Sequence, residues 1–173
     1  MKRNIFLALL AIIAMAVSAQ DNAPAPQDTP QLEFVMQLKV TLDQAYSVGE
    51  IPNGRRQVIP ITGGTFEGPL LKGTILNGGA DYQRSSTDGK RTEIEAIYSI
   101  KTDDDVYIHI RNRGLICSGT TDDGKPQFYF RCAPQFEAPV GSRYEWLNNS
   151  LFLCAPSFSR DFKGITLNVW RVK

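Results

Sequence analysis

The sequence has very little of the chemistry that most hydrolases and metalloenzymes need. It contains one histidine, His109, and three cysteines. A Ser-His-Asp hydrolase needs a histidine base beside its nucleophile, and the chain has neither a G-x-S-x-G nor an S-x-x-K motif. Zinc sites usually draw several His or Cys ligands at regular spacing. We therefore expect no serine-hydrolase site, no metal site and no cofactor.

Phosphate-binding and calcium-binding motifs are also missing. Gly63 and Gly64 are not followed by the G-K-[ST] of a phosphate loop, and residues 103–105 are three aspartates without the D-x-[DN]-x-[DN]-G spacing of a calcium loop. The chain also lacks a large net charge, because it has 19 basic residues and 18 acidic ones. A nearly neutral chain has no broad basic surface for nucleic acid or anionic lipid.

The only long hydrophobic run lies at the N-terminus. Lys2 and Arg3 precede an apolar stretch over residues 5–17, and small residues at 17–19 suit a signal peptidase. This predicts a signal peptide over residues 1–19 and export, to the periplasm or the medium. The run is shorter than the roughly 20 residues that span a bilayer, so no membrane span is expected.

A proline-rich leader follows the predicted cleavage site, over residues 20–31. The remaining residues, 32–173, are enough for one domain with a hydrophobic core but not for two. Apolar and polar residues alternate over 32–42 and in eight further segments separated by turn signals such as Asn53-Gly54 and Asp88-Gly89. The further segments are 56–61, 65–76, 81–86, 91–101, 106–113, 127–132, 150–154 and 165–172. The pattern predicts an all-β fold: a single antiparallel β-barrel of about 8–10 strands, with one short helical turn at 142–149.

One predicted hairpin joins residues 91–101 to residues 106–113. The apolar residues of both strands have even numbers, so an odd loop length places them on one face. With Lys101 opposite Asp105, the odd-numbered face forms a charged ladder of two pairs. These pairs are Glu95 with Arg111 and Glu93 with Arg113, and Ile97 falls opposite His109. Alternation does not decide whether the ladder faces solvent or the barrel interior.

Two other features leave alternatives open. Paired glycines at 63 and 64 are typical of a bulge or barrel corner, which either aims Glu67 into the barrel or leaves it at an exposed strand end. The three cysteines allow at most one internal disulfide. A Cys117–Cys132 bridge forms across the turn at 122–124 only if the loop places the two residues opposite each other.

Six motifs, in order, carry a family resemblance: IPITGGTFEGP, NGGADYQ, EIEAIYSIKTDD, IHIRNRG, YFRCAPQFEAP and YEWLN. They resemble the bacterial and fungal family known as domain of unknown function 3237, over nearly all of residues 32–172. The resemblance implies a compact β-barrel, often oligomeric, without an established general activity. It also implies a set of candidate pocket residues: Glu67, Asp81, Glu95, Arg111, Arg113, Tyr129, Arg131 and Trp146. Cys132 departs from the family pattern, in which a threonine-like residue is expected.

Two hypotheses for function follow. In the first, the barrel binds a small organic ligand, polar or anionic, which the arginines hold beside Glu95, Tyr129 and Trp146. In the second, it is a cofactor-free isomerase, cyclase or lyase in which Glu67 or Asp81 moves a proton while an arginine stabilises negative charge. Glu95 is a poorer base because Arg111 holds it ionised. A homo-oligomeric scaffold without a ligand is the remaining alternative.

Overall fold

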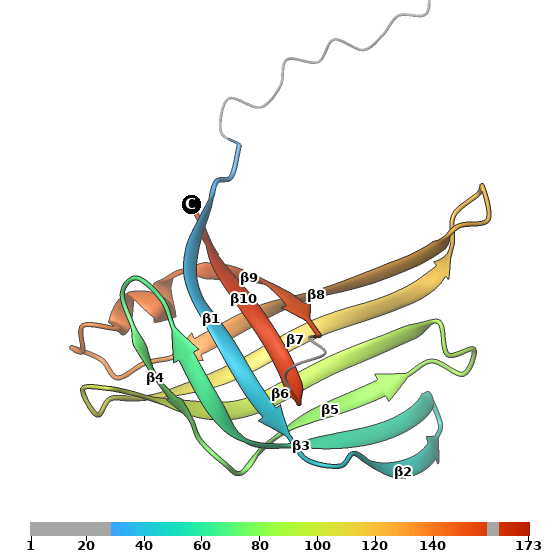
Figure 1. The fold of residues 1–173 in the computed structure, drawn as a ribbon, viewed down its shortest axis with the longest axis horizontal. Coiled ribbons are helices and arrows are strands. Elements are labelled where there is room, and N and C mark those ends of the chain that lie inside the picture. Colours follow the sequence, from blue (N-terminus) through green and yellow to red (C-terminus); the bar gives the residue numbers. More distant parts are fainter. Residues whose placement is uncertain (1–28, 159–162) are drawn as a thin grey trace, which may run out of the picture.

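Ten β-strands and one short 3-10 helix make up the part of the chain that the computed structural model describes, residues 29–158 and 163–173 (Figure 1). The predicted signal peptide and most of the predicted leader lie outside the described residues. The strands are β1 (Leu32–Leu42), β2 (Tyr46–Ile51), β3 (Gly54–Glu67), β4 (Lys72–Ile75), β5 (Gly79–Ser85), β6 (Arg91–Thr102), β7 (Tyr107–Thr120), β8 (Pro126–Glu137), β9 (Leu151–Ser157) and β10 (Gly164–Val172).

The strands close into an antiparallel barrel of eight positions. Going round the wall, β1 pairs with β10, followed by β9, β8, β7 and β6. The next position in the wall is shared by two short strands, β5 and β4, which lie one after the other beside β6. Both strands also pair with β3, and β3 pairs with β1 to close the ring. Strand β2 adds to β3 outside this ring. The predicted all-β barrel is therefore confirmed, and its closure leaves few free strand edges.

The interior is filled by the apolar half of each alternating strand. Even-numbered residues of β6 and β7 meet there, with Ile100 opposite Ile108 and Tyr98 opposite Ile110. Met36 and Leu38 of β1 are fully buried on the same side of the wall. An eight-stranded barrel is just wide enough for side chains to fill it. The apolar set therefore points inward, and the charged set stays in water.

Strand β3 changes neighbours at the paired glycines. Its first half pairs with β5 and its second half with β1 and β4, and the β1–β3 register shifts between Thr41 and Leu42. Gly63 and Gly64 have φ values of 141° and 133°. A Cβ atom on Gly64 would lie 2.0 Å from the carbonyl oxygen of Lys39. The structure thus confirms that these glycines allow a bulge and a close backbone approach.

The two ends of the barrel differ. At one end the 3-10 helix η1 (Glu145–Asn149), the coil near β4 in Figure 1, places Leu147 against the core. Phe136 and Phe152 pack edge to face beneath it, with ring centroids 4.8 Å apart. This helix confirms the turn predicted at 142–149. At the other end the long β7–β8 hairpin projects past the wall (Figure 1). A cavity in the interior lies toward this end, with Ile116 of β7 and Phe130 of β8 in its lining.

The strand boundaries differ from the prediction at two places. The segment expected as one strand over 65–76 is two strands, β3 and β4, because Gly68 and Pro69 interrupt it and proline cannot donate to a ladder. Strand β2 was missed because its side chains are largely exposed and give no apolar alternation. Within the described residues, no helix has the length and apolar character needed to cross a membrane.

Candidate functional site

A cavity of about 90 Å³ lies at the open end of the barrel interior. Its walls are mainly apolar and come from β1, β3 and β5 to β10, including Val40, Ile61, Ile94, Phe130 and Leu167. Phe158, with 68% of its surface exposed, stands at the opening. Pockets for drug-sized ligands measure about 300–1,000 Å³. This cavity can enclose one end of a small molecule.

Asp81 is the carboxylate on the cavity wall. It pairs with Ile59 of β3 on one side and with Ala96 of β6 on the other, so the side chain shares the inward face with these apolar residues. Its Oδ2 atom accepts a hydrogen bond from Gln83 Nε2 at 2.7 Å. Its Oδ1 atom is shielded from solvent and has no protein partner. A buried acceptor left open in this way needs an explanation.

Burial changes the acidity of this carboxyl group. Removal from water raises the pKa of Asp81 from 3.8 to about 6, and the Gln83 hydrogen bond, with a weaker contribution from the nearby Glu95 backbone N–H, offsets only part of the effect. Desolvation disfavours the charged form of an acid. Asp81 therefore changes its protonation state close to neutral pH, where a general acid or base is most useful.

Asn112 is a second open acceptor on the same inward face. It lies opposite Ala96 on β7, so Asp81 and Asn112 flank this small residue in one row across three strands. Asn112 is 3% exposed, and its Oδ1 atom has no hydrogen-bond partner. Tyr98 lines the cavity in the adjoining row, and burial raises the pKa of its hydroxyl. The cavity thus combines apolar walls with two unpaired acceptors.

The other predicted site residues lie elsewhere. Glu67, Arg111, Arg113, Tyr129 and Arg131 are exposed on the outside of the barrel. Glu95 is on the same outer face, and Trp146 lies at the closed end, where its ring stacks with Arg171 at 5.5 Å. The eight candidate pocket residues therefore do not share one cavity. Of the eight candidates, only Asp81 lines the interior cavity.

The predicted charged ladder on β6 and β7 exists, but it faces solvent. Each β6 residue lies opposite a β7 residue two positions further along the chain than predicted. Glu95 lies opposite Arg113 and Ile97 opposite Arg111, while His109 lies opposite Ser99. The parity was right, since the apolar residues do share a face. The register differs because the loop consists of residues 103–105, with Thr102 and Val106 bonded across its base. The ladder stays outside because removing guanidinium and carboxylate groups from water costs several kcal/mol each.

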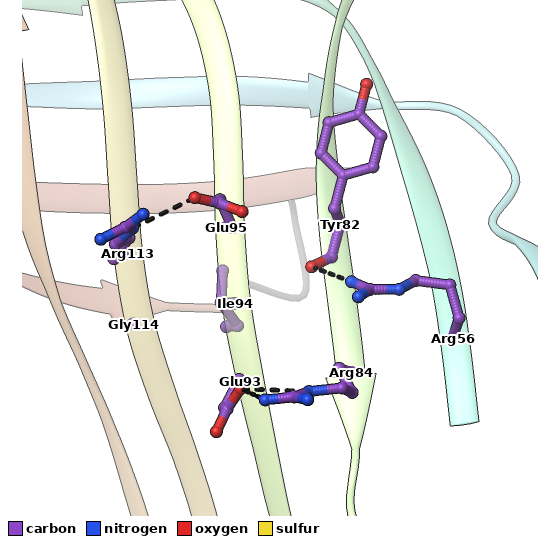
Figure 2. A pocket seen from close by; sticks show the side chains of 8 residues that line it. All are labelled: Arg56, Tyr82, Arg84, Glu93, Ile94, Glu95, Arg113 and Gly114. Atoms are coloured by element: carbon purple, nitrogen blue, oxygen red, sulfur yellow. Dashed lines mark hydrogen bonds and ion pairs between the residues drawn. The ribbon is translucent and has the colours of Figure 1, made fainter. Parts of the chain in front are cut away.

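An open cavity of about 370 Å³ lies on this outer face (Figure 2). Arg56 of β3, Arg84 of β5, Arg113 of β7 and the two glutamates of β6, Glu93 and Glu95, surround it. Figure 2 shows Arg84 turned toward Glu93 and Arg113 toward Glu95. The interior and outer cavities lie on opposite faces of the same strands, and Ile94 of β6 lines both.

The cysteine prediction also needs correction. Cys117 lies opposite Tyr129, and Cys132 lies opposite Gly114 on β7 and Cys154 on β9. A Cys117–Cys132 bridge is therefore wrong, because the register separates the two residues. The two facing thiols, Cys132 and Cys154, are buried and unbridged. Their mutual hydrogen bond and burial raise the pKa of the Cys132 thiol.

Two interior residues were missed by sequence reasoning, Asn112 and Tyr98. Asn112 has the same parity as Ile108 and Ile110, which was the available signal: a polar residue on the apolar face of a strand. Tyr98 was assigned correctly to that face but not to the site. In the described part of the chain, no three His, Cys, Asp or Glu side chains are grouped to hold a metal ion.

Comparison with known proteins places this barrel in a family. Residues 30–172 match the family model described as "Protein of unknown function (DUF3237)". The chain is 35% identical over 136 residues to a UPF0311 protein of Clostridium acetobutylicum, covering 72% of this chain and 84% of that relative. The chain therefore belongs to the DUF3237 family, as its motifs predicted.

Two further similarities bear on fold and chemistry. A β-barrel-like protein from Acinetobacter baumannii has a crystal structure that matches this one with a TM-score of 0.74 at 30% identity, covering 86% of this chain and 99% of that chain. The hydroalkoxylation enzyme phnH of Penicillium herquei is 28% identical over 144 residues, which cover 83% of this chain and 84% of the enzyme. This chain thus has a relative that is named as an enzyme.

Proposed function

We propose that this member of the DUF3237 family binds a small organic molecule at the open end of its barrel. The apolar part of the ligand enters the interior cavity, and the single proton of a hydroxyl group is donated to Asp81 or to Asn112. The observation that carries the proposal is the pair of buried, unpartnered acceptors, Asp81 Oδ1 and Asn112 Oδ1. Each costs roughly 1–3 kcal/mol when left unsatisfied, and a ligand with a donor offsets that cost.

The electrostatics of the cavity favour a neutral ligand. Among residues 29–158 and 163–173, no arginine or lysine lines the interior cavity, so the described walls offer an anion no cation. Above about pH 6 the Asp81 carboxyl is ionised and repels negative charge. We therefore replace the hypothesis of an anionic ligand, held inside the barrel by arginines, with the hypothesis of a neutral ligand that is an alcohol or a phenol.

Calorimetric titration with phenol and toluene tests the proposal. The two probes have similar size, and only phenol carries a donor. One satisfied hydrogen bond contributes about 0.5–1.5 kcal/mol, so phenol is expected to bind roughly 2- to 10-fold more tightly than toluene. Asn112→Leu should reduce this difference, while Gln135→Leu, the same kind of change on the outer face of β8, should leave it unchanged.

The contrary results are equally clear. Equal affinities for phenol and toluene would mean that the acceptors do not select the ligand. If neither probe binds, the cavity is not a ligand site and the scaffold alternative gains support.

A second candidate function is proton-transfer catalysis at Asp81. Its support is a carboxyl group with a pKa of about 6 inside an apolar cavity and a relative named as a hydroalkoxylation enzyme. In such a reaction an O–H group adds across a C=C bond. Protonated Asp81 would give its proton to one alkene carbon while the hydroxyl oxygen bonds to the other. The hydroxyl proton then returns to the Asp81 carboxylate, so the residue is regenerated.

The probe 2-allylphenol separates catalysis from binding, because adding its hydroxyl across its alkene gives an isomeric cyclic ether. Asp81→Asn keeps an acceptor oxygen but carries no transferable proton. If Asp81 is catalytic, the variant binds the probe and forms no cyclic ether, while the wild type does. No conversion by the wild type above the Asp81→Asn background would count against catalysis.

We also propose that the protein acts outside the cytoplasm, on the basis of the signal-peptide pattern in residues 1–19. N-terminal sequencing of the protein purified from the periplasm or medium should begin at Gln20. A full-length chain found in the cytoplasm would contradict export.

A further inference from the structure

We propose that the outer cavity is a second binding site, and that it binds a small organic anion through a carboxylate or phosphate group. It is formed by the outward-facing side chains of β3, β5, β6 and β7 (Figure 2). The interior cavity lies on the opposite face of these strands and takes a different class of ligand. The two proposals are independent of each other.

The charges around the outer cavity do not balance. Arg84 and Arg91 share one carboxylate, that of Glu93. Arg111 and Arg113 share another, that of Glu95, with the Arg113 Nε atom 3.1 Å from Glu95 Oε1.

Arg56 has no carboxylate partner among residues 29–158 and 163–173. Its Nη1 atom donates instead to the backbone oxygen of Tyr82 at 3.1 Å. The cavity lining therefore holds three guanidinium groups, those of Arg56, Arg84 and Arg113, against two carboxylates, a surplus of one positive charge.

The register places two of these cations directly opposite each other. Arg56 of β3 pairs with Arg84 of β5, and both side chains project from the outer face. Neighbouring strands are about 4.8 Å apart, and like charges directly opposite are destabilising. An anion between the two guanidinium groups removes this repulsion. Glu93 already offsets part of this repulsion through its ion pair with Arg84, and an anion beside Arg56 would offset the rest.

The geometry also indicates the class of ligand. The hydrogen bond to Tyr82 holds the Arg56 guanidinium in place and leaves most of its five N–H donors available. A planar fork of donors matches the two oxygens of a carboxylate or the oxygens of a phosphate. Tyr82, 41% exposed, lines the same cavity and offers an apolar surface. An aromatic or otherwise apolar body attached to the anionic group therefore fits the site.

Two-dimensional NMR titrations at low salt test the inference, with sodium benzoate and inorganic phosphate as the anionic probes and benzyl alcohol as the neutral control. Benzoate is expected to shift the amide signals of β3 and β5 around Arg56 and Arg84 in a saturable way. Phosphate should shift the same signals, and the two affinities show which oxyanion the site prefers. Both affinities should fall as salt is added.

A pair of neighbouring arginines supplies the matched variants. Arg56→Gln removes a donor at the site, whereas Arg55→Gln removes the same charge from a residue paired with Glu50. Arg56→Gln should weaken benzoate binding roughly 10-fold or more. Arg55→Gln should weaken it far less. Equal losses in the two variants would show general charge attraction rather than a site and would overturn the inference. Saturable shifts by benzyl alcohol of equal affinity, or no saturable shift with either anion, would also overturn it.

Discussion

The substitution Asp81→Asn should make the protein's stability less dependent on pH. In the native barrel, burial raises the pKa of Asp81 to about 6, against 3.8 for a solvated aspartate. Between these two pH values the native state holds a proton that the unfolded state has lost. Stability therefore falls as pH rises through this interval and then levels off. The change in pKa corresponds to about 3 kcal/mol at the plateau.

Urea unfolding of the wild type and the variant at a series of pH values measures this effect. Other groups titrate equally in both proteins, so the difference between their free energies of unfolding isolates Asp81. The variant should gain about 3 kcal/mol relative to the wild type as pH rises from below 3.8 to above about 6. The non-titrating change Asn112→Leu, in the same cavity, should give a difference that does not vary with pH.

Two results would refute this reasoning. A difference between Asp81→Asn and the wild type that is constant over the whole range would mean that burial does not alter the acidity of Asp81. A wild type that gains stability relative to the variant as pH rises would mean that the cavity favours the charged carboxylate.

Three other predictions follow from the same structure. Asn112→Leu should raise the free energy of unfolding by roughly 1–3 kcal/mol, because it removes a buried acceptor without a partner; urea denaturation measures this, and a loss of stability would contradict it. In the native protein, iodoacetamide should label Cys117 and leave the buried Cys132 and Cys154 unlabelled, as peptide mapping by mass spectrometry would show. Mild oxidation should link Cys132 only to Cys154, and a disulfide-linked Cys117–Cys132 peptide would show that the register is wrong. Gly64→Ala should lower the melting temperature, because the new Cβ meets the Lys39 carbonyl oxygen at 2.0 Å and φ is 133°; Gly49→Ala, where φ is also positive but nothing lies within 4 Å, should cost less.

The sequence predicted the barrel because the alternation of apolar and polar residues within each strand determines which face of the sheet is buried. Residues 94–100 and 106–110 place their apolar side chains on one face whatever the exact register. The register itself was wrong by two residues, since it depends on how three consecutive aspartates close a loop. Strand β2 carries no buried stripe, and the interruption of the strand predicted at 65–76 was overlooked although Gly68 and Pro69 are visible in the sequence.

The site was predicted less well than the fold. Alternation shows that the odd-numbered and even-numbered side chains of a strand lie on opposite faces of the sheet. The cost of burying charge then decides which of these faces points into the barrel. Applied to β6 and β7, that cost argues for the apolar face as the interior and for Glu95, Arg111 and Arg113 as surface residues. Asp81 came from a motif of the family and proved to be the inward carboxylate. Its pairing with Ile59 and Ala96 crosses three strands, which no local pattern reveals.

The most direct test of the central claim is a carbon-13 NMR titration of the Asp81 carboxyl group, without ligand, with toluene and with phenol. The predicted midpoint without ligand is about 6. Phenol should lower it, because a hydroxyl that donates to the carboxylate stabilises the charged form, and toluene should not. A midpoint near 3.8 without ligand, or equal midpoints with phenol and toluene, would contradict a cavity built to bind a hydroxyl group through Asp81.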